Sequence, residues 1–269
     1  MDSPRDHQTD LIIQEETPSP TRWHKAKSLG KALLWILILA LVFMTAGYIS
    51  DILKLNKFHP LLGQSSTLLL AISPIAIYLL VRRIKLKELY LDFKFSEARK
   101  NYLYYLLLIL ILVPMFILSK FSPFSELALL ELAFALPVGI LVELYFRGII
   151  FYSLRRAFNI PTAILLSAAF FALGRIAADF FIFENTGTLV QIIELFLFGL
   201  VFAQLAYLTK NILPLMLLHA LHQLSVDGLF FYALDHDWVY IAQGALMLAL
   251  AVFLLFKVSK QARAQLELE

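Results

Sequence analysis

The chain has 269 residues, of which 60% are hydrophobic, and its mean hydropathy is +0.77. A soluble domain has roughly 45–50% apolar residues, so this composition excludes an ordinary soluble protein and indicates one that crosses a membrane several times. The formal net charge of +3 is too small to indicate a nucleic-acid partner, and the absence of cysteine excludes disulfides, thiolate metal ligands and a cysteine nucleophile.

Residues 1–28 are polar and predict a disordered cytoplasmic tail rather than a cleaved signal peptide. Beyond them the chain predicts an all-α polytopic membrane helix bundle over residues 29–257 and a second cytoplasmic tail at 258–269. A spanning helix needs about 20 mostly apolar residues. About eight transmembrane helices are expected, at 30–50, 61–81, 102–119, 127–152, 160–182, 188–208, 211–233 and 238–257.

Lysine and arginine are concentrated in alternate connections and at both ends of the chain. Such connections usually face the cytoplasm, so both termini are expected there, in a cell membrane. Residues 82–100 mix basic and apolar positions, and they are either a solvated loop or a segment that lies on anionic lipid. No internal repeat supports an inverted-repeat transporter.

Glu143 and Arg147 lie four residues apart inside an apolar run, which places both on one helix face. An ionisable residue at membrane depth is costly unless it is paired, so this pair is either a structural ion pair or part of a catalytic site. A second arginine, Arg175, follows Phe171 at the same spacing. Its expected counter-charges are Asp179, Glu143 and Glu194.

A later helix carries two histidines and a glutamine, and His219 and Gln223 share one face of it. His222 lies close to one turn from His219. Two neutral imidazoles at this spacing can bind a metal ion such as zinc, but a pair alone does not complete a site. A histidine that is hydrogen-bonded within the membrane is the simpler alternative.

The fragments Glu143-Leu-Tyr-Phe-Arg-Gly148, Ser167-Ala-Ala-Phe-Phe171, Phe198-Gly-Leu-Val-Phe202 and Asn211 through His219 resemble, in order and spacing, the CPBP family. These are integral membrane proteins of the CAAX-protease and bacteriocin-processing type, related to the type II CAAX prenyl endopeptidases. The resemblance covers about residues 125–225. It implies a membrane scaffold for an intramembrane endopeptidase, expected in a bacterial inner membrane.

The family pattern is Glu-Glu-x-x-x-Arg, then Phe-x-x-x-His, then His-x-x-x-Asn or Asp. In this family the first glutamate is the general base, and the histidines and the asparagine hold a metal ion or steady the oxyanion. Carried over, the pattern matches at four positions and departs from it at three. The matches are Glu143, Arg147, Phe171 and His219, and the replaced positions are Val142, Arg175 and Gln223.

The replacements predict a loss of chemistry. Val142 cannot act as a base, and Arg175 stays protonated and would repel a cation, so neither a metal ion nor another cofactor is expected. The sequence therefore predicts a pseudoprotease that binds or regulates membrane proteins, or membrane-tethered or prenylated peptides, in the lipid bilayer.

Two alternatives stay open. An active endopeptidase would use Glu143 with His219 and His222, with zinc as a candidate metal. A small transporter or channel would line its path with charged residues, among them Arg147 and Glu194.

Overall fold

The computed structural model describes residues 21–54, 60–91, 102–118, 126–183, 189–226 and 237–266, and in this part of the chain the protein is all-α. A 3₁₀ turn, Leu86–Leu89, follows α3, and a π-helical segment, Leu144–Ile150, joins α5 to α6. Counted with α5 to α6 as one continuous helix, the described residues form eight helices, as predicted. The elements are α1 (Arg22–Ile52), α3 (Pro60–Arg82), α4 (Leu103–Leu118), α5 (Glu126–Glu143), α6 (Phe151–Arg155), α7 (Ile160–Phe183), α8 (Leu189–Thr209), α9 (Leu213–Val226) and α10 (Asp237–Leu266).

Within the described residues, four helical stretches are long and apolar enough to cross a bilayer: Arg22–Thr45, Ala135–Arg155, Ile192–Thr209 and Ile241–Ala264. Many large apolar side chains on the outside of the bundle are exposed, which a soluble surface would not tolerate and lipid would cover. The bundle is therefore built to be embedded in a bilayer. The shorter apolar helices are Leu70–Arg82, Leu103–Pro114, Ile160–Ile176 and Leu213–Leu224.

Two helices extend beyond their predicted ends. The first begins at Arg22, inside the predicted N-terminal tail, and α10 runs to Leu266, inside the predicted C-terminal tail. Lysine and arginine are good helix formers whose long side chains reach water from a helix end, so a basic flank need not end a helix. Residues 1–20 and 92–100, and the end of the predicted stretch 211–233, lie outside the described residues.

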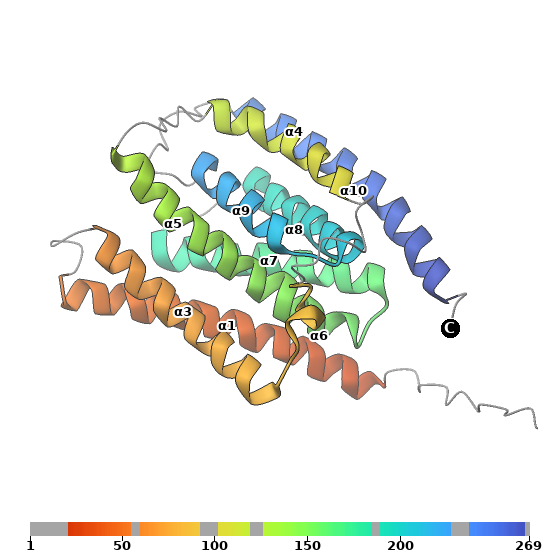
Figure 1. Ribbon diagram of the computed structural model, residues 1–269, viewed down its shortest axis with the longest axis horizontal. Coiled ribbons are helices and arrows are strands. Elements are labelled where there is room, and N and C mark those ends of the chain that lie inside the picture. The colour runs from red at the N-terminus through yellow and green to blue at the C-terminus, as the bar shows by residue number, and fades with distance from the viewer. Residues whose placement is uncertain are drawn as a thin grey trace, which may run out of the picture.

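Figure 1 shows three layers of helices. The first is the pair α1 and α3, the last is the pair α4 and α10, and α5, α7, α8 and α9 lie between them. The span in α8 is mostly buried, since it packs against α7 on one side and α10 on the other. The charged residues singled out from the sequence therefore lie in the middle layer, away from lipid.

A proline interrupts the backbone hydrogen bonds of α3 close to the point where this helix contacts the middle layer. Pro74 has no N–H, so the carbonyl of Leu70 loses its usual helical partner. The hydroxyl of Ser73 donates to that carbonyl at 2.8 Å instead. Nearby, the hydroxyl of Tyr145 donates to the carbonyl of Ala71 at 3.2 Å. This bond connects the middle of α3 to the π-helical segment.

Helices α5 and α9 approach each other closely at Gly139. A Cβ atom at this position would lie 2.5 Å from the carbonyl oxygen of Met216 and 2.8 Å from the amide nitrogen of Ala220. Both contacts are with backbone, which cannot move aside as a flexible side chain can. The absence of a side chain at Gly139 thus sets how closely Glu143, one turn further along α5, approaches α9.

We expect Gly139→Ala to lower the free energy of unfolding by about 1–3 kcal/mol, because the added methyl group forces the two helices apart. The measurement is unfolding of the purified protein in mixed micelles, followed by tryptophan fluorescence. Gly244→Ala is the matched control, because no atom lies within 4 Å of a Cβ built there. An equal loss in both variants would mean that close packing at Gly139 contributes nothing.

Candidate functional site

The site forms where α5 changes into the π-helical segment. Glu143 is the last residue of α5, and Arg147 lies within the wider turns of Leu144–Ile150. The sequence predicted one regular helix over 127–152, and the π-helical segment was not expected. π-helical turns are rare and are found frequently at functional sites. Here the wider backbone carries a fully buried arginine whose side chain must turn into the protein.

One carboxylate oxygen joins three of the predicted residues. Oε1 of Glu143 lies 2.9 Å from Nη1 of Arg147 and 2.6 Å from Nδ1 of His219 on α9. All three residues are buried, with at most 2% of their surface exposed. A buried charge needs such pairing, and the short His219 contact requires the proton on Nδ1 if Glu143 is ionised.

Aromatic rings enclose this group. The guanidinium carbon of Arg147 lies 4.4 Å from the ring centre of Phe171 and 5.2 Å from that of Phe202. The His219 ring meets the rings of Phe171, Phe198 and Phe202 edge to face. Cation–π contacts strengthen when water is excluded, so the rings stabilise Arg147 in addition to Glu143.

Two rings of this enclosure were not expected from the sequence. Phe198 and Phe202 belong to a fragment that carried the family resemblance, but they were not expected to form the site. The carbonyl of Gly199, between them, accepts a hydrogen bond of 3.3 Å from Nη2 of Arg147. The only signal in the sequence was a glycine flanked by aromatic residues on a helix. Close helix packing also explains this glycine, because a Cβ at Gly199 would come within 3.1 Å of Ala168.

Two of the replaced positions contact each other across α7 and α9. Nη1 of Arg175 donates to Oε1 of Gln223 at 3.2 Å. Arg175 was expected to pair with an acidic residue, and that ion pair stays a prediction beside the described hydrogen bond to the amide of Gln223. The side chain of Asp179, one expected counter-charge, lies outside the described residues. The positive charge of Arg175 also acts on the ring of His219.

The remaining predicted residues lie in the same bundle with different surroundings. The ring of His222 stacks on Phe198, with ring centres 4.4 Å apart. Val142 is partly buried and packs against the main apolar core. Glu194 on α8 is 6% exposed, and within the described residues no hydrogen bond or ion pair links it to the Glu143 group. Its role as a second negative charge beside Arg175 stays a prediction.

The side chains do not fit a metal ion. Among the described residues, no three His, Asp or Glu side chains come together as a ligand set, and a structural or catalytic zinc site needs at least three protein ligands. His219 is already hydrogen-bonded to Glu143, and the guanidinium of Arg175 would repel a cation nearby. No chemical step is assigned to a metal ion on these residues.

A comparison with protein families identifies one segment of the chain. Residues 124–225 match the family described as type II CAAX prenyl endopeptidase Rce1-like. This segment is an Rce1-like domain. No curated protein and no solved structure matches the chain. The matched residues agree with the range 125–225 expected from the motifs.

The Rce1-like domain consists of α5 to α9, the middle layer of the bundle and the layer that holds Glu143, Arg147 and His219. The helices outside the match, α1, α3, α4 and α10, cover it on two sides (Figure 1). Together with the long apolar helices, the family makes this chain a multi-pass membrane protein.

Proposed function

We propose that the Rce1-like domain is a pseudoprotease that binds or regulates membrane-tethered or prenylated peptides, or partner membrane proteins, without cleaving them. The proposed location is a bacterial inner membrane, which rests on the family resemblance and the positive-inside pattern. The prenylated ligand rests on the name of the family alone. The loss of activity rests on the side chains of this chain.

The observation that carries the proposal is the hydrogen bond between Arg175 and Gln223. In the family these positions hold a histidine and an asparagine that bind a metal ion or steady the oxyanion. Here a guanidinium takes the histidine's place and is bonded to the replacement of the asparagine. Val142 stands at the position of the general base. This chain therefore lacks the family's base as well as the histidine and the asparagine.

The retained residues support a binding role. Glu143, Arg147 and His219 form a buried, hydrogen-bonded group that holds α5, α8 and α9 together. On the outside of the domain, Leu173 and Leu217 are more than half exposed. Such surfaces of α7 and α9 can receive an apolar chain from the side of the bilayer.

The proposal predicts binding without hydrolysis. A fluorescent farnesylated peptide should bind the full-length protein in detergent micelles, as fluorescence anisotropy would show, and should stay intact by mass spectrometry. Glu143→Ala should leave the amount of intact peptide unchanged. Cleavage by the natural protein that disappears in Glu143→Ala would overturn the proposal, and an unprenylated peptide controls for binding through the apolar group.

One observation favours a second candidate, an active endopeptidase with Glu143 as base. Oε1 of Glu143 is held by Arg147 and His219, while Oε2 is buried and has no hydrogen-bond partner among the described residues. A carboxylate oriented in this way could accept a proton from an attacking water, with His219 steadying it. The same cleavage assay tests this candidate, which requires that Glu143→Ala abolish hydrolysis.

A further inference from the structure

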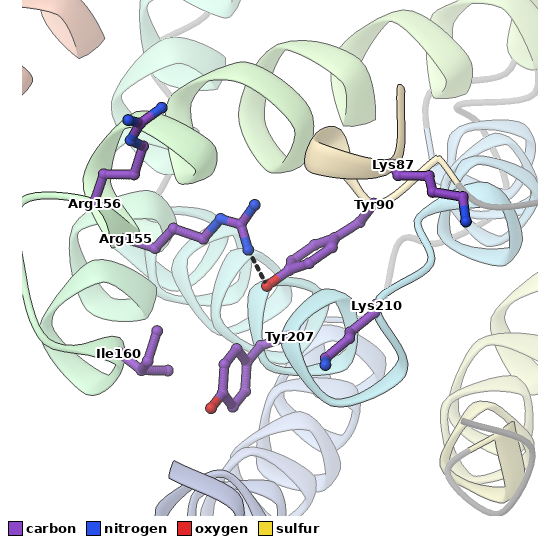
Figure 2. A pocket seen from close by; sticks show the side chains of 7 residues that line it. All are labelled: Lys87, Tyr90, Arg155, Arg156, Ile160, Tyr207 and Lys210. Atoms are coloured by element: carbon purple, nitrogen blue, oxygen red, sulfur yellow. Dashed lines mark hydrogen bonds between the residues drawn. The ribbon is translucent and has the colours of Figure 1, made fainter. Parts of the chain in front are cut away.

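A cavity of about 360 Å³ lies at one end of the bundle, lined by residues from four separate parts of the chain. Among them are four cations, contributed by the 3₁₀ turn after α3, by the end of α6 and by the turn between α8 and α9. Figure 2 shows the guanidinium of Arg155 turned toward Tyr90, with Lys87 and Lys210 on the other side. The lining residues are Lys87, Tyr90, Arg155, Arg156, Ile160, Tyr207 and Lys210.

Arg155 is held in place before any ligand binds. Its Nη1 donates to the hydroxyl of Tyr90 at 2.6 Å and its Nη2 donates to the carbonyl of Glu88. The guanidinium carbon also lies 4.3 Å from the ring centre of Tyr90. These bonds use one N–H of each Nη atom, so a second N–H on each Nη remains for a ligand, whereas Nε is buried and without a partner among the described residues. A positioned guanidinium with free donors suits the oxygens of a phosphate.

Tyr90 supplies a neutral donor at the floor of the cavity. Only 6% of its surface is exposed, and burial raises the pKa of its hydroxyl, although the nearby charge of Arg155 acts in the opposite direction. The hydroxyl therefore keeps its proton at neutral pH. Because its oxygen accepts from Arg155, its own O–H remains able to donate to an anion.

Two lining residues have backbone conformations that non-glycine residues rarely adopt. Tyr90 has φ of 59° and Lys210 has φ of 50°, both in the left-handed region. Lys210 directly follows α8, where glycine is the usual residue. The carbonyl of Tyr90 accepts a hydrogen bond of 2.9 Å from the amide of Ile212, which ties these two turns together. Strain of this kind persists where the surroundings enforce it, and it is concentrated at binding sites.

One carboxylate lies near the cavity without neutralising it. Glu88 accepts a hydrogen bond of 2.7 Å from Tyr152, which holds the pKa of the carboxyl below its ordinary value. Tyr152 in turn accepts from Arg156 at 2.6 Å. Glu88 is therefore ionised at neutral pH, and its carboxylate accepts the hydrogen bond from Tyr152. Among the described residues it offsets one of the four cations, and the lining keeps a positive charge.

The cavity lies at the edge of the apolar layer. Two of the apolar stretches end at its rim, at Arg155 and at Thr209, the residue before Lys210. Phospholipid phosphates lie at this depth of a bilayer, and each lysine or arginine near an anionic surface contributes about 1 kcal/mol of attraction. Four cations and a tyrosine donor line the cavity at this level, which suits the oxygens of a phosphate group.

We propose that this cavity binds a phosphate group, supplied by an anionic phospholipid headgroup at the membrane surface. Arg155 and Tyr90 form the fixed part of the site, and the exposed side chains of Lys87 and Lys210 close over the phosphate from the other side. The site is separate from the Glu143 group and does not depend on whether the Rce1-like domain cleaves peptides.

The test is native mass spectrometry of the full-length protein in detergent, titrated with phosphatidylglycerol and, separately, with phosphatidylcholine. We expect preferential binding of phosphatidylglycerol, weakened at least about tenfold in the double variant Lys87→Gln and Lys210→Gln, because each lysine accounts for about fivefold. Both lysines are exposed, so the fold should tolerate their loss, which a thermal melt would verify.

A matched control removes the same charge from the same end of the bundle. Nε2 of Gln204 near the end of α8 donates to the carbonyl of Ala251 in α10, and Lys257 and Lys260 lie beyond Ala251 on that helix. The double variant Lys257→Gln and Lys260→Gln should weaken phosphatidylglycerol binding by less than about threefold, because these exposed lysines lie outside the cavity. Equal weakening in the two double variants would overturn the proposal, since the attraction would then be diffuse.

A further titration distinguishes the sources of the phosphate. One outcome is that inorganic phosphate at millimolar concentration displaces phosphatidylglycerol in a way that depends on Lys87 and Lys210. That result would support a phosphate site, with a soluble phosphate and not a lipid as its ligand. If phosphatidylcholine binds as tightly as phosphatidylglycerol, or if only an acidic peptide binds, the proposal is wrong.

Discussion

Glu143→Leu should lower the free energy of unfolding by about 3–5 kcal/mol, the largest loss expected from one substitution in this protein. The reason is that the change leaves Arg147 without its carboxylate partner. Arg147 is 1% exposed, and its charge would remain buried with the carbonyl of Gly199 and two aromatic rings as its described partners. His219 would lose its 2.6 Å contact in the same step. The measurement is unfolding in mixed micelles followed by tryptophan fluorescence.

The control removes both charges of the ion pair. A buried ion pair that is replaced as a whole by apolar residues of similar volume is often neutral or stabilising, whereas removal of one partner is strongly destabilising. The double variant Glu143→Leu and Arg147→Met should therefore be more stable than Glu143→Leu alone. If the double variant is less stable than the single one, the cost does not come from an unpaired Arg147, and the structural role assigned to this pair is wrong.

This buried group also shows what sequence could and could not predict. Apolar runs of membrane-spanning length predicted the eight helices, because bilayer thickness fixes that length. The four-residue spacing predicted that Glu143 and Arg147 meet, since neighbouring turns of one helix have fixed geometry. It did not predict the bond from Glu143 to His219, because the rotation and depth of one helix against another follow from packing, as at Gly139.

The same limit applies to Arg175. A lone arginine in an apolar helix needs a partner, and acidic residues were the reasonable candidates. In the structure Arg175 donates a hydrogen bond to Gln223 on α9. Residue spacing within α7 cannot predict a contact with a different helix. The π-helical segment was likewise not predicted, since its sequence Leu144–Ile150 also suits a regular helix and surrounding contacts decide between the two.

Restoring the three replaced positions should restore chemistry if those replacements are what removed it. In the triple variant Val142→Glu, Arg175→His and Gln223→Asn, the repelling guanidinium is gone and the family's base, histidine and amide return. We expect binding of about one zinc ion per chain, since three or more ligands would then be available beside His219. Hydrolysis of a farnesylated peptide should rise about 100-fold or more above the natural protein, the typical contribution of a positioned base.

A second triple variant separates zinc binding from the contribution of the general base. Val142→Gln, combined with Arg175→His and Gln223→Asn, has the same ligand changes but no base at residue 142, so it should bind zinc and leave the peptide intact. Zinc is measured by elemental analysis after removal of loosely bound metal, and cleavage by mass spectrometry. A folded first variant that neither binds zinc nor cleaves would mean that α5, α7 and α9 no longer hold these positions at catalytic spacing. The inactivity would then lie in the packing of the helices as well as in Val142, Arg175 and Gln223.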